Sequence, residues 1–134
     1  MRIILFLLLT LILGCTPKNK NIEVNNLNTS KYKDIKPNRY NVAFLIMDGT
    51  YNTELTAPFD IFQHTIFREG IKPMNVFTVA NTDNAVTSFE GMRILPDFNY
   101  LTDELPKIDI LVVPSAEGHL GKDLEDEAML KFVQ

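Results

Sequence analysis

The chain has 134 residues, of which 46% are hydrophobic, a net charge of −4 and a single cysteine, Cys15. This length allows one domain, and one cysteine excludes both a disulfide framework and a site built from several thiolates. Residues 41–134 contain six basic and fifteen acidic side chains, a net charge of −9, which argues against nucleic-acid binding because phosphates require a basic surface.

The amino terminus predicts a lipoprotein signal over residues 1–14. Residues 3–13 are apolar except for Thr10. Eleven residues rise about 16 Å as a helix, roughly half of a bilayer core, so this segment is too short for a stable span and is typical of a signal-peptide core. The sequence I-L-G-C at residues 12–15 resembles a bacterial lipobox, in which Cys15 receives lipid. The alternative is an ordinary secretory signal followed by an incidental cysteine.

Acylation of Cys15 would keep the protein on a membrane, because two buried acyl chains are sufficient for lasting attachment. We therefore expect the bacterial cell envelope as the location and a lipid membrane as a partner through Cys15. No other cysteine remains as a nucleophile or metal ligand in the 134 residues. Residues 15–40 are rich in Asn and Lys, show no hydrophobic period and predict a flexible tether whose basic residues favour anionic head groups.

Three apolar runs predict the strands of a parallel sheet within a domain over residues 41–134. They cover residues 41–47, 74–80 and 108–113. The first and third are continuous, which is typical of strands buried on both faces. Between the second and third, residues 85–95 predict a hairpin or a pair of edge strands around Gly91, and residues 98–105 predict an irregular or helical link.

Two segments predict helices. The first covers residues 54–69, with capping residue types at residues 50–53, and its predicted buried stripe consists of Leu55, Phe59, Phe62 and Ile66. Pro58 lies within it and would kink the helix unless it falls in the first turn. The second follows a loop that contains Gly118 and covers residues 123–134, with one side formed by Leu124, Ala128, Met129, Phe132 and Val133.

This order of elements predicts an α/β fold, with parallel strands joined by right-handed crossovers. Ligands in such sheets bind where loops leave the carboxyl ends of the strands, so residues 115–120 are the first place to seek a site. Three strands and two helices leave one sheet edge unpaired, and the last helix reaches Gln134 without a cap. We therefore expect the chain to be a fragment, or the product of a truncated reading frame.

Three motifs follow one another in the predicted domain. Residues 42–62 read VAFLIMDGTYNTELTAPFDIF, residues 91–97 read GMRILPD, and residues 108–118 read IDILVVPSAEG. In this order and spacing they resemble the amino-terminal part of the ThiJ/PfpI family, of the class I glutamine-amidotransferase-like superfamily, and its isonitrile hydratase-like subgroup in particular. The resemblance implies a flavodoxin-like (Rossmann-like) parallel sheet with flanking helices, incomplete here, and a homodimer for an intact member.

The resemblance implies part of a catalytic site. The acidic residue of the family's first helix matches Glu54; in the family it hydrogen-bonds a nucleophilic cysteine and helps to set its protonation. The strand-to-helix elbow that carries this cysteine follows the helix at which the present sequence stops. Pro114 and Gly118 match the family's Pro-Gly-Gly-x-Gly loop, whereas Ser115 and Ala116 replace two glycines whose amides approach the substrate.

Other catalytic side chains are poorly supported by the sequence. Ser115 lacks a G-x-S-x-G setting, and His119, four residues away in the same loop, is a poor base for it. His64 is most simply a surface residue, and two histidines so far apart do not suggest a metal site. We predict no cofactor.

Two classes of function remain open. The first is a membrane-anchored lipoprotein with a truncated, inactive domain, which in a continued form would be a cysteine-dependent hydratase, deglycase or amidase-like enzyme for a small molecule. The second is a non-catalytic small-molecule-binding or sensor domain, which the Ser115-Ala116 substitution favours. A transcription regulator is opposed by the signal peptide and by the absence of a basic helix-turn-helix.

Overall fold

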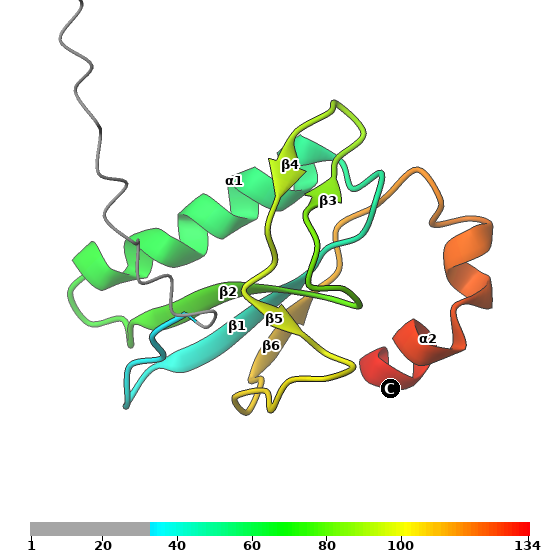
Figure 1. The fold of residues 1–134 in the computed structure, drawn as a ribbon. Helices are drawn as coiled ribbons and strands as arrows, with labels where there is room; N and C mark the ends of the chain where they lie inside the picture. The colour runs from blue at the N-terminus through cyan, green and yellow to red at the C-terminus, as the bar shows by residue number, and fades with distance from the viewer. Residues whose placement is uncertain (1–32) are drawn as a thin grey trace, which may run out of the picture.

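The computed structural model describes residues 33–134, so the predicted signal peptide, Cys15 and most of the predicted tether lie outside the described residues. The elements in chain order are β1 (Tyr40–Leu45), α1 (Asn52–Gln63), the 3₁₀ helix η1 (His64–Phe67), β2 (Met74–Ala80), β3 (Val86–Thr87), β4 (Arg93–Ile94), β5 (Phe98–Asn99), β6 (Ile110–Val112), the 3₁₀ helix η2 (Lys122–Glu125) and α2 (Glu127–Val133) (Figure 1). Within this described part, none of the helices has the length and apolar character needed to cross a bilayer.

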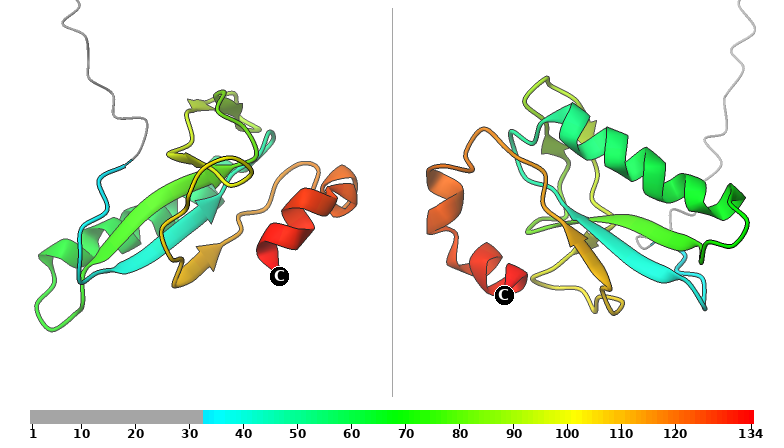
Figure 2. Two further views of the ribbon diagram at one scale, coloured as in Figure 1. Left: turned by 60° about the horizontal axis from the view of Figure 1, so that its bottom comes forward. Right: turned by 180° about the vertical axis from the view of Figure 1, so that it is seen from behind.

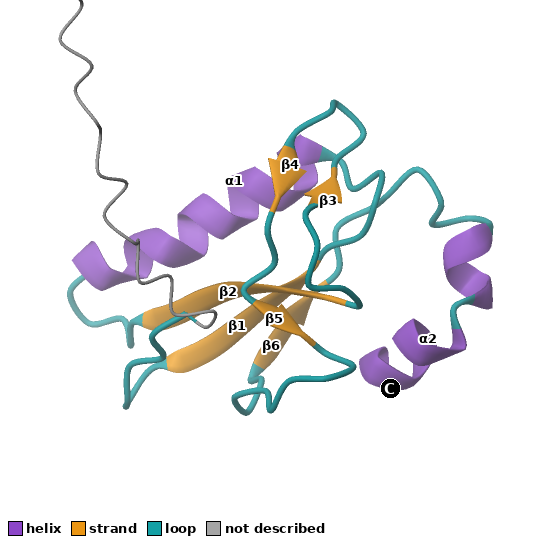
Figure 3. Ribbon diagram, viewed as in Figure 1, coloured by secondary structure: helices purple, strands orange, loops and turns teal. Residues whose placement is uncertain are grey.

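The strands β5-β2-β1-β6 form one parallel sheet in that order (Figure 3). The predicted α/β fold with a parallel sheet is confirmed, and β2 has the bounds expected from the sequence. The predicted irregular link is confirmed for residues 100–105 but was wrong for Phe98 and Asn99, which form β5 and pair with Val79 and Ala80. Two residues are too few for a strand to leave a readable alternation in the sequence.

The third predicted strand is shorter and more exposed than expected. It covers Ile110–Val112 as β6, and Ile110 is 36% and Val113 50% exposed. The prediction of burial on both faces was therefore wrong. Strand β6 is at the edge of the described sheet and pairs only with β1. Strands β1 and β2 are central, and all their apolar residues after the first position of each strand are buried. An apolar run reports the character of its residues but not how many neighbours the strand has.

Helix α1 covers one face of the sheet. Leu55 is buried, and Phe59 and Phe62 pack on Phe44 of β1, with ring centroids 5.2 and 6.0 Å away. The helix starts earlier than predicted and continues through Pro58, but it changes to the 3₁₀ helix η1 after Gln63. Ile66 therefore leaves the predicted stripe and is 46% exposed.

The opposite face has its own core, against which α2 packs. The two views in Figure 2 show the sheet between α1 and α2. Met129 and Phe132 of α2 pack against this core, and the Phe132 ring stacks on Tyr100 at 4.4 Å. The predicted single helix over residues 123–134 was wrong, because the chain breaks at Asp126, whose Oδ1 accepts the backbone N–H of Met129 at 2.9 Å. The remaining members of its predicted apolar side, Leu124, Ala128 and Val133, are exposed.

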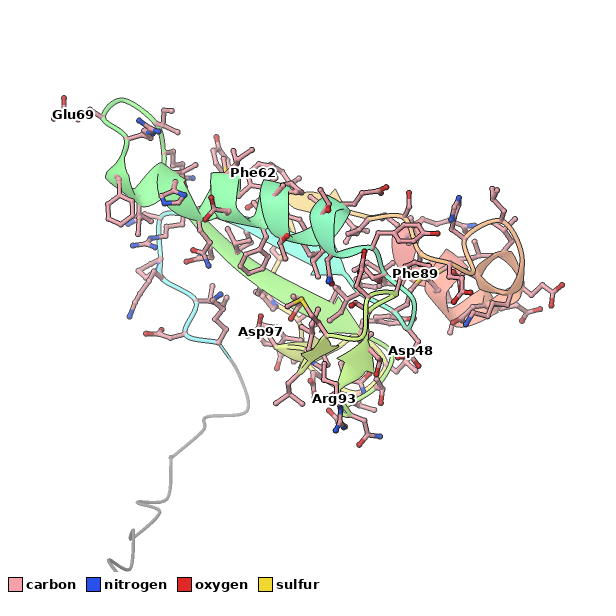
Figure 4. All side chains as sticks on the ribbon, turned by 90° about the horizontal axis from the view of Figure 1, so that it is seen from above. Asp48, Phe62, Glu69, Phe89, Arg93 and Asp97 are labelled. Carbon is pink, nitrogen blue, oxygen red and sulfur yellow. The ribbon has the colours of Figure 1, made fainter. Side chains whose placement is uncertain are left out.

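The predicted hairpin is confirmed as the antiparallel pair β3 and β4, which forms a sheet of its own above the α1 face. Its turn contains Gly91 at φ +89°, a conformation that L side chains rarely adopt. Asp97, labelled in Figure 4, follows β4 and links the β3–β4 hairpin to β2 through hydrogen bonds. Its Oδ2 accepts the backbone N–H and the hydroxyl of Thr78 at 2.8 and 3.1 Å, which keeps that buried residue hydrogen-bonded.

Candidate functional site

The loops that follow β1 and β6 meet at the carboxyl edge of the sheet. Thr50 and Ala116 form an isolated antiparallel bridge, and the backbone N–H of Tyr51 donates to the carbonyl of Ser115 at 3.0 Å. The two loops leave neighbouring parallel strands at the same edge, which is why they lie close together. The loop predicted from sequence to carry a site is thus held against the start of α1.

The turn at Asp48 and Gly49 shapes this edge. Gly49 has φ +85°, and a Cβ added there would lie 3.0 Å from the Cβ of Glu117, so a side chain is excluded by both conformation and space. The Asp48 carboxylate accepts the backbone N–H of Thr87 at 2.8 Å, and Gly49 donates its own N–H to the Thr87 carbonyl at 2.8 Å. The turn therefore joins the edge of the main sheet to the β3–β4 hairpin.

Glu54 and Ser115, which are 61 positions apart in the sequence, meet at this edge. Oε2 of Glu54 accepts the backbone N–H of Ser115 at 2.9 Å. Hydrogen bonds from the Ser115 side chain and then its backbone lower the pKa of Glu54, and the nearby His119 lowers it further. Glu54 also stands in the first turn of α1, where helix amides favour a negative charge. The carboxylate is therefore held in its ionised form.

The other predicted loop residues have structural surroundings. Pro114 and Ala116 are buried. A Cβ at Gly118 would lie 2.5 Å from Cε of Lys122 and 2.8 Å from both carboxylate oxygens of Asp123, so this glycine permits the close packing of η2 on the loop. Gly118 thus has a packing role that the motif comparison did not reveal.

The two histidines lie at different edges of the domain. The ring Nδ1 of His119 hydrogen-bonds the carbonyl of Ala116, within the site loop. His64 lies at the other end of α1, where it pairs with Asp60 at 3.3 Å and its side chain is 52% exposed, so its prediction as a surface residue is confirmed. Among residues 33–134, no group of three His, Cys, Asp or Glu side chains is placed to hold a metal ion.

Sequence reasoning assigned one residue of this edge the wrong role, because it took Thr50 as a capping residue, and it missed another, Glu90. Thr50, 1% exposed, donates its hydroxyl to the Met47 carbonyl at 2.7 Å and accepts the Met47 N–H at 3.1 Å, so it does not cap α1. The first N–H of α1, from Asn52, is accepted instead by Oε2 of Glu90 at 3.1 Å. A threonine after an Asp-Gly turn is a local signal that could have been read. Glu90 is 38 positions from Asn52 and gives no such signal.

An acidic cleft of 240 Å³ lies at the carboxyl ends of β1 and β2, beside η2 and α2. Its polar lining consists of Asp48, Asn81, Tyr100, Lys122, Asp123 and Asp126. Burial, followed by the charge of Asp126, raises the pKa of Tyr100 to about 12, so its hydroxyl remains a donor at neutral pH. Oδ2 of Asp123 is buried and has no hydrogen-bond partner within residues 33–134. The cleft is therefore lined by an excess of negative charge, and one of its aspartates has a buried carboxylate oxygen without a partner in the described residues.

Comparison with known proteins places this domain by its fold. No family model matches the sequence, and no curated protein matches it. DJ-1beta of Drosophila melanogaster matches with a TM-score of 0.56 and 17% identity, over 71% of this chain and 47% of that chain. A thiJ/pfpI family protein from Bacillus anthracis gives 0.56 and 17% over 75% and 46%, and one from Pseudomonas syringae gives 0.52 and 22% over 79% and 44%.

The described domain therefore has the flavodoxin-like DJ-1/ThiJ/PfpI fold, a parallel sheet with flanking helices, as the sequence motifs predicted. The chain spans about half the length of these three solved structures.

Proposed function

We propose that the protein is an envelope lipoprotein, anchored through Cys15, whose domain binds a small molecule at the carboxyl edge without catalysing a reaction by itself. The observation that supports this most strongly is the hydrogen bond from the Ser115 N–H to Glu54. A general base works best with a pKa near the working pH, whereas the pKa of Glu54 is shifted downward. The only cysteine of the 134 residues is Cys15.

The acidic cleft suggests the chemistry of the ligand. Its lining contains three aspartates and one lysine, and the buried Oδ2 of Asp123 lacks a donor from residues 33–134. A buried acceptor without a partner is costly, and a charged donor would relieve that cost. We infer a small cationic amine as the ligand class.

A cysteine-dependent hydratase, deglycase or amidase-like enzyme is the second candidate, for a longer chain that would act as a homodimer. The observation in its favour is the position of Glu54, in the first turn of a helix at the carboxyl edge. A thiol supplied next to that carboxylate could exchange a proton with it. In this candidate the thiol would meet Oε1 of Glu54, because Oε2 accepts the Ser115 N–H.

Titration of Glu54 distinguishes the two candidates. We expect the NMR shift of the Ser115 amide to titrate with a midpoint below the ordinary carboxyl pKa, because the hydrogen bonds favour the ionised form. The loop contact should persist above that midpoint and be lost as the pH falls through it. Glu54→Gln should abolish the titration, whereas Glu117→Gln, an exposed acid of the same loop, should preserve it.

The purified chain should turn over neither isonitriles nor dicarbonyls, and Glu54→Gln should leave this unchanged. A midpoint near neutral pH, or turnover that Glu54→Gln removes, would reject the non-catalytic proposal in favour of the enzyme.

Binding of 1,4-diaminobutane tests the ligand class. We expect the amide shifts of residues around the cleft to saturate with added diamine, and Asp123→Asn to weaken the affinity by about tenfold or more, as for a lost charged hydrogen bond. Glu104→Gln removes one exposed acid outside the cleft and serves as the matched control. An equal loss of affinity in the two variants would mean that the diamine responds only to net charge. That result, or an affinity unchanged in Asp123→Asn, would mean that the cleft is not its site.

A further inference from the structure

Exposed apolar side chains gather at the amino edge of the sheet, opposite the candidate site. Ile61 is 68%, Phe67 74% and Ile71 51% exposed. They come from the end of α1, from η1 and from the loop that leads into β2, and Ile61 and Ile71 line one shallow hollow together with Arg68. Single exposed apolar residues are ordinary, but a contiguous group marks a surface that contacts something apolar.

Basic side chains surround this apolar group. Arg68 lines the hollow, Lys72 Nζ lies 4.1 Å from the ring centroid of Tyr40, and Lys33 Nζ lies 5.4 Å from that of Phe59. Two acids near this edge pair with lysines, Asp34 with Lys36 and Asp109 with Lys107. Asp60 also lines the hollow and lies 3.3 Å from His64, which is charged only when protonated. Glu69, labelled in Figure 4 at this end of the molecule, is a further acid here.

The opposite edge is strongly acidic. The segment that follows β6, residues 113–127, contains five acids and one lysine, and the cleft adds Asp48. Helix α1 runs from this acidic edge to the basic one, because it connects the carboxyl end of β1 to the amino end of β2. The domain therefore has one apolar and basic end and one acidic end.

The chain enters the domain at the apolar and basic end. Residues 33–39 precede β1, and the described chain starts there, as Figure 1 shows. Ile35 packs on the core of the α2 face, and the backbone N–H of Lys36 donates to Oδ1 of Asn75 at 3.2 Å. The described chain thus starts at the same end of the domain as the exposed apolar group.

We propose that this amino edge docks on an anionic lipid bilayer, with Ile61, Phe67 and Ile71 in the interface and Arg68 and Lys72 against the head groups. Apolar side chains flanked by Lys and Arg are the pattern of interfacial membrane binding. The proposal rests on the proposed anchoring through Cys15, which keeps the domain near the surface, and it is independent of the ligand site. Docking in this pose turns the acidic carboxyl edge away from the negatively charged membrane.

A single tryptophan tests the pose, because the chain contains none. The full lipidated chain carrying Phe67→Trp is reconstituted in phosphatidylglycerol-containing vesicles with brominated acyl chains. We expect a blue-shifted emission that the bromines quench. Leu120→Trp, at an 82% exposed site of the acidic end, is the matched control and should stay red-shifted and unquenched. Equal quenching of the two probes, or none in either, would overturn the docking pose.

Charge variants test the head-group contacts. Each basic residue near an anionic surface contributes about fivefold to binding, so Arg68→Gln with Lys72→Gln should weaken docking roughly 30-fold. Lys122→Gln with Lys131→Gln removes the same charge from the other end and should have little effect.

The tryptophan probe also tests a second copy of the chain as the occupant. A blue shift of the Phe67→Trp emission that is insensitive to bromine and grows with protein density would identify that copy, and would also overturn the proposal.

Failure of the anchor is recognised separately. An absent acyl group on Cys15 would reject the anchoring. Docking of the amino edge would still be measured, as the binding of the Phe67→Trp variant to vesicles.

Discussion

Replacing Cys15 with serine is expected to transfer the protein from the membrane fraction to the soluble fraction. The reason is the loss of the two acyl chains proposed on Cys15, each of which would contribute about 0.8 kcal/mol for every buried CH₂ group. The apolar segment of residues 3–13 is too short to span a bilayer as a stable helix and cannot replace them. The docking surface at Phe67 retains only a weak, salt-sensitive attraction. Fractionation of cells, with the protein detected in each fraction, measures the result.

A conservative change next to the anchor provides the control for this experiment. Thr16→Ser leaves the cysteine in place and should leave the protein in the membrane fraction. Mass spectrometry of the amino-terminal peptide should find a diacylated Cys15 in this variant and in the unchanged protein. Retention of Cys15→Ser in the membrane at high salt would argue for a different attachment and against the lipoprotein interpretation.

Phe44→Ala should destabilise the domain by about 3–5 kcal/mol, as is usual when a fully buried phenylalanine is truncated. The Phe44 side chain is 0% exposed and contacts Phe59 and Phe62 of α1. This loss is a large part of the roughly 5–15 kcal/mol that stabilises a typical domain. Urea unfolding followed by far-ultraviolet circular dichroism measures the change, provided that the slope with urea stays constant.

Phe67→Ala removes the same group from a surface site and is the matched control. Phe67 is 74% exposed, so its truncation should change the free energy of unfolding by less than about 0.5 kcal/mol. Similar losses in the two variants would mean that α1 is not held to the sheet as described. Because Phe44 holds α1 and the first turn of α1 carries Glu54, the Ser115 contact should weaken together with the fold in Phe44→Ala.

The sequence alone determined the main elements of this domain. The apolar runs of β1 and β2, the stripe of Leu55, Phe59 and Phe62, and the hairpin around Gly91 were all readable, because burial requires apolar residues at the period of each element. The order of three short motifs also predicted the DJ-1/ThiJ/PfpI fold, which the solved structures confirm.

Only the tertiary structure decided how these elements combine. Strand β5 is too short to leave a pattern, and the exposure of β6 depends on its position at the edge of the described sheet. Glu54 and Ser115 were each candidate site residues, but their hydrogen bond joins positions 61 apart in the sequence. Such contacts depend on which strands become neighbours and which loops leave the same edge. The period of apolar residues along the chain indicates which side chains are buried. Which residues a side chain contacts is set by the packing of the whole sheet.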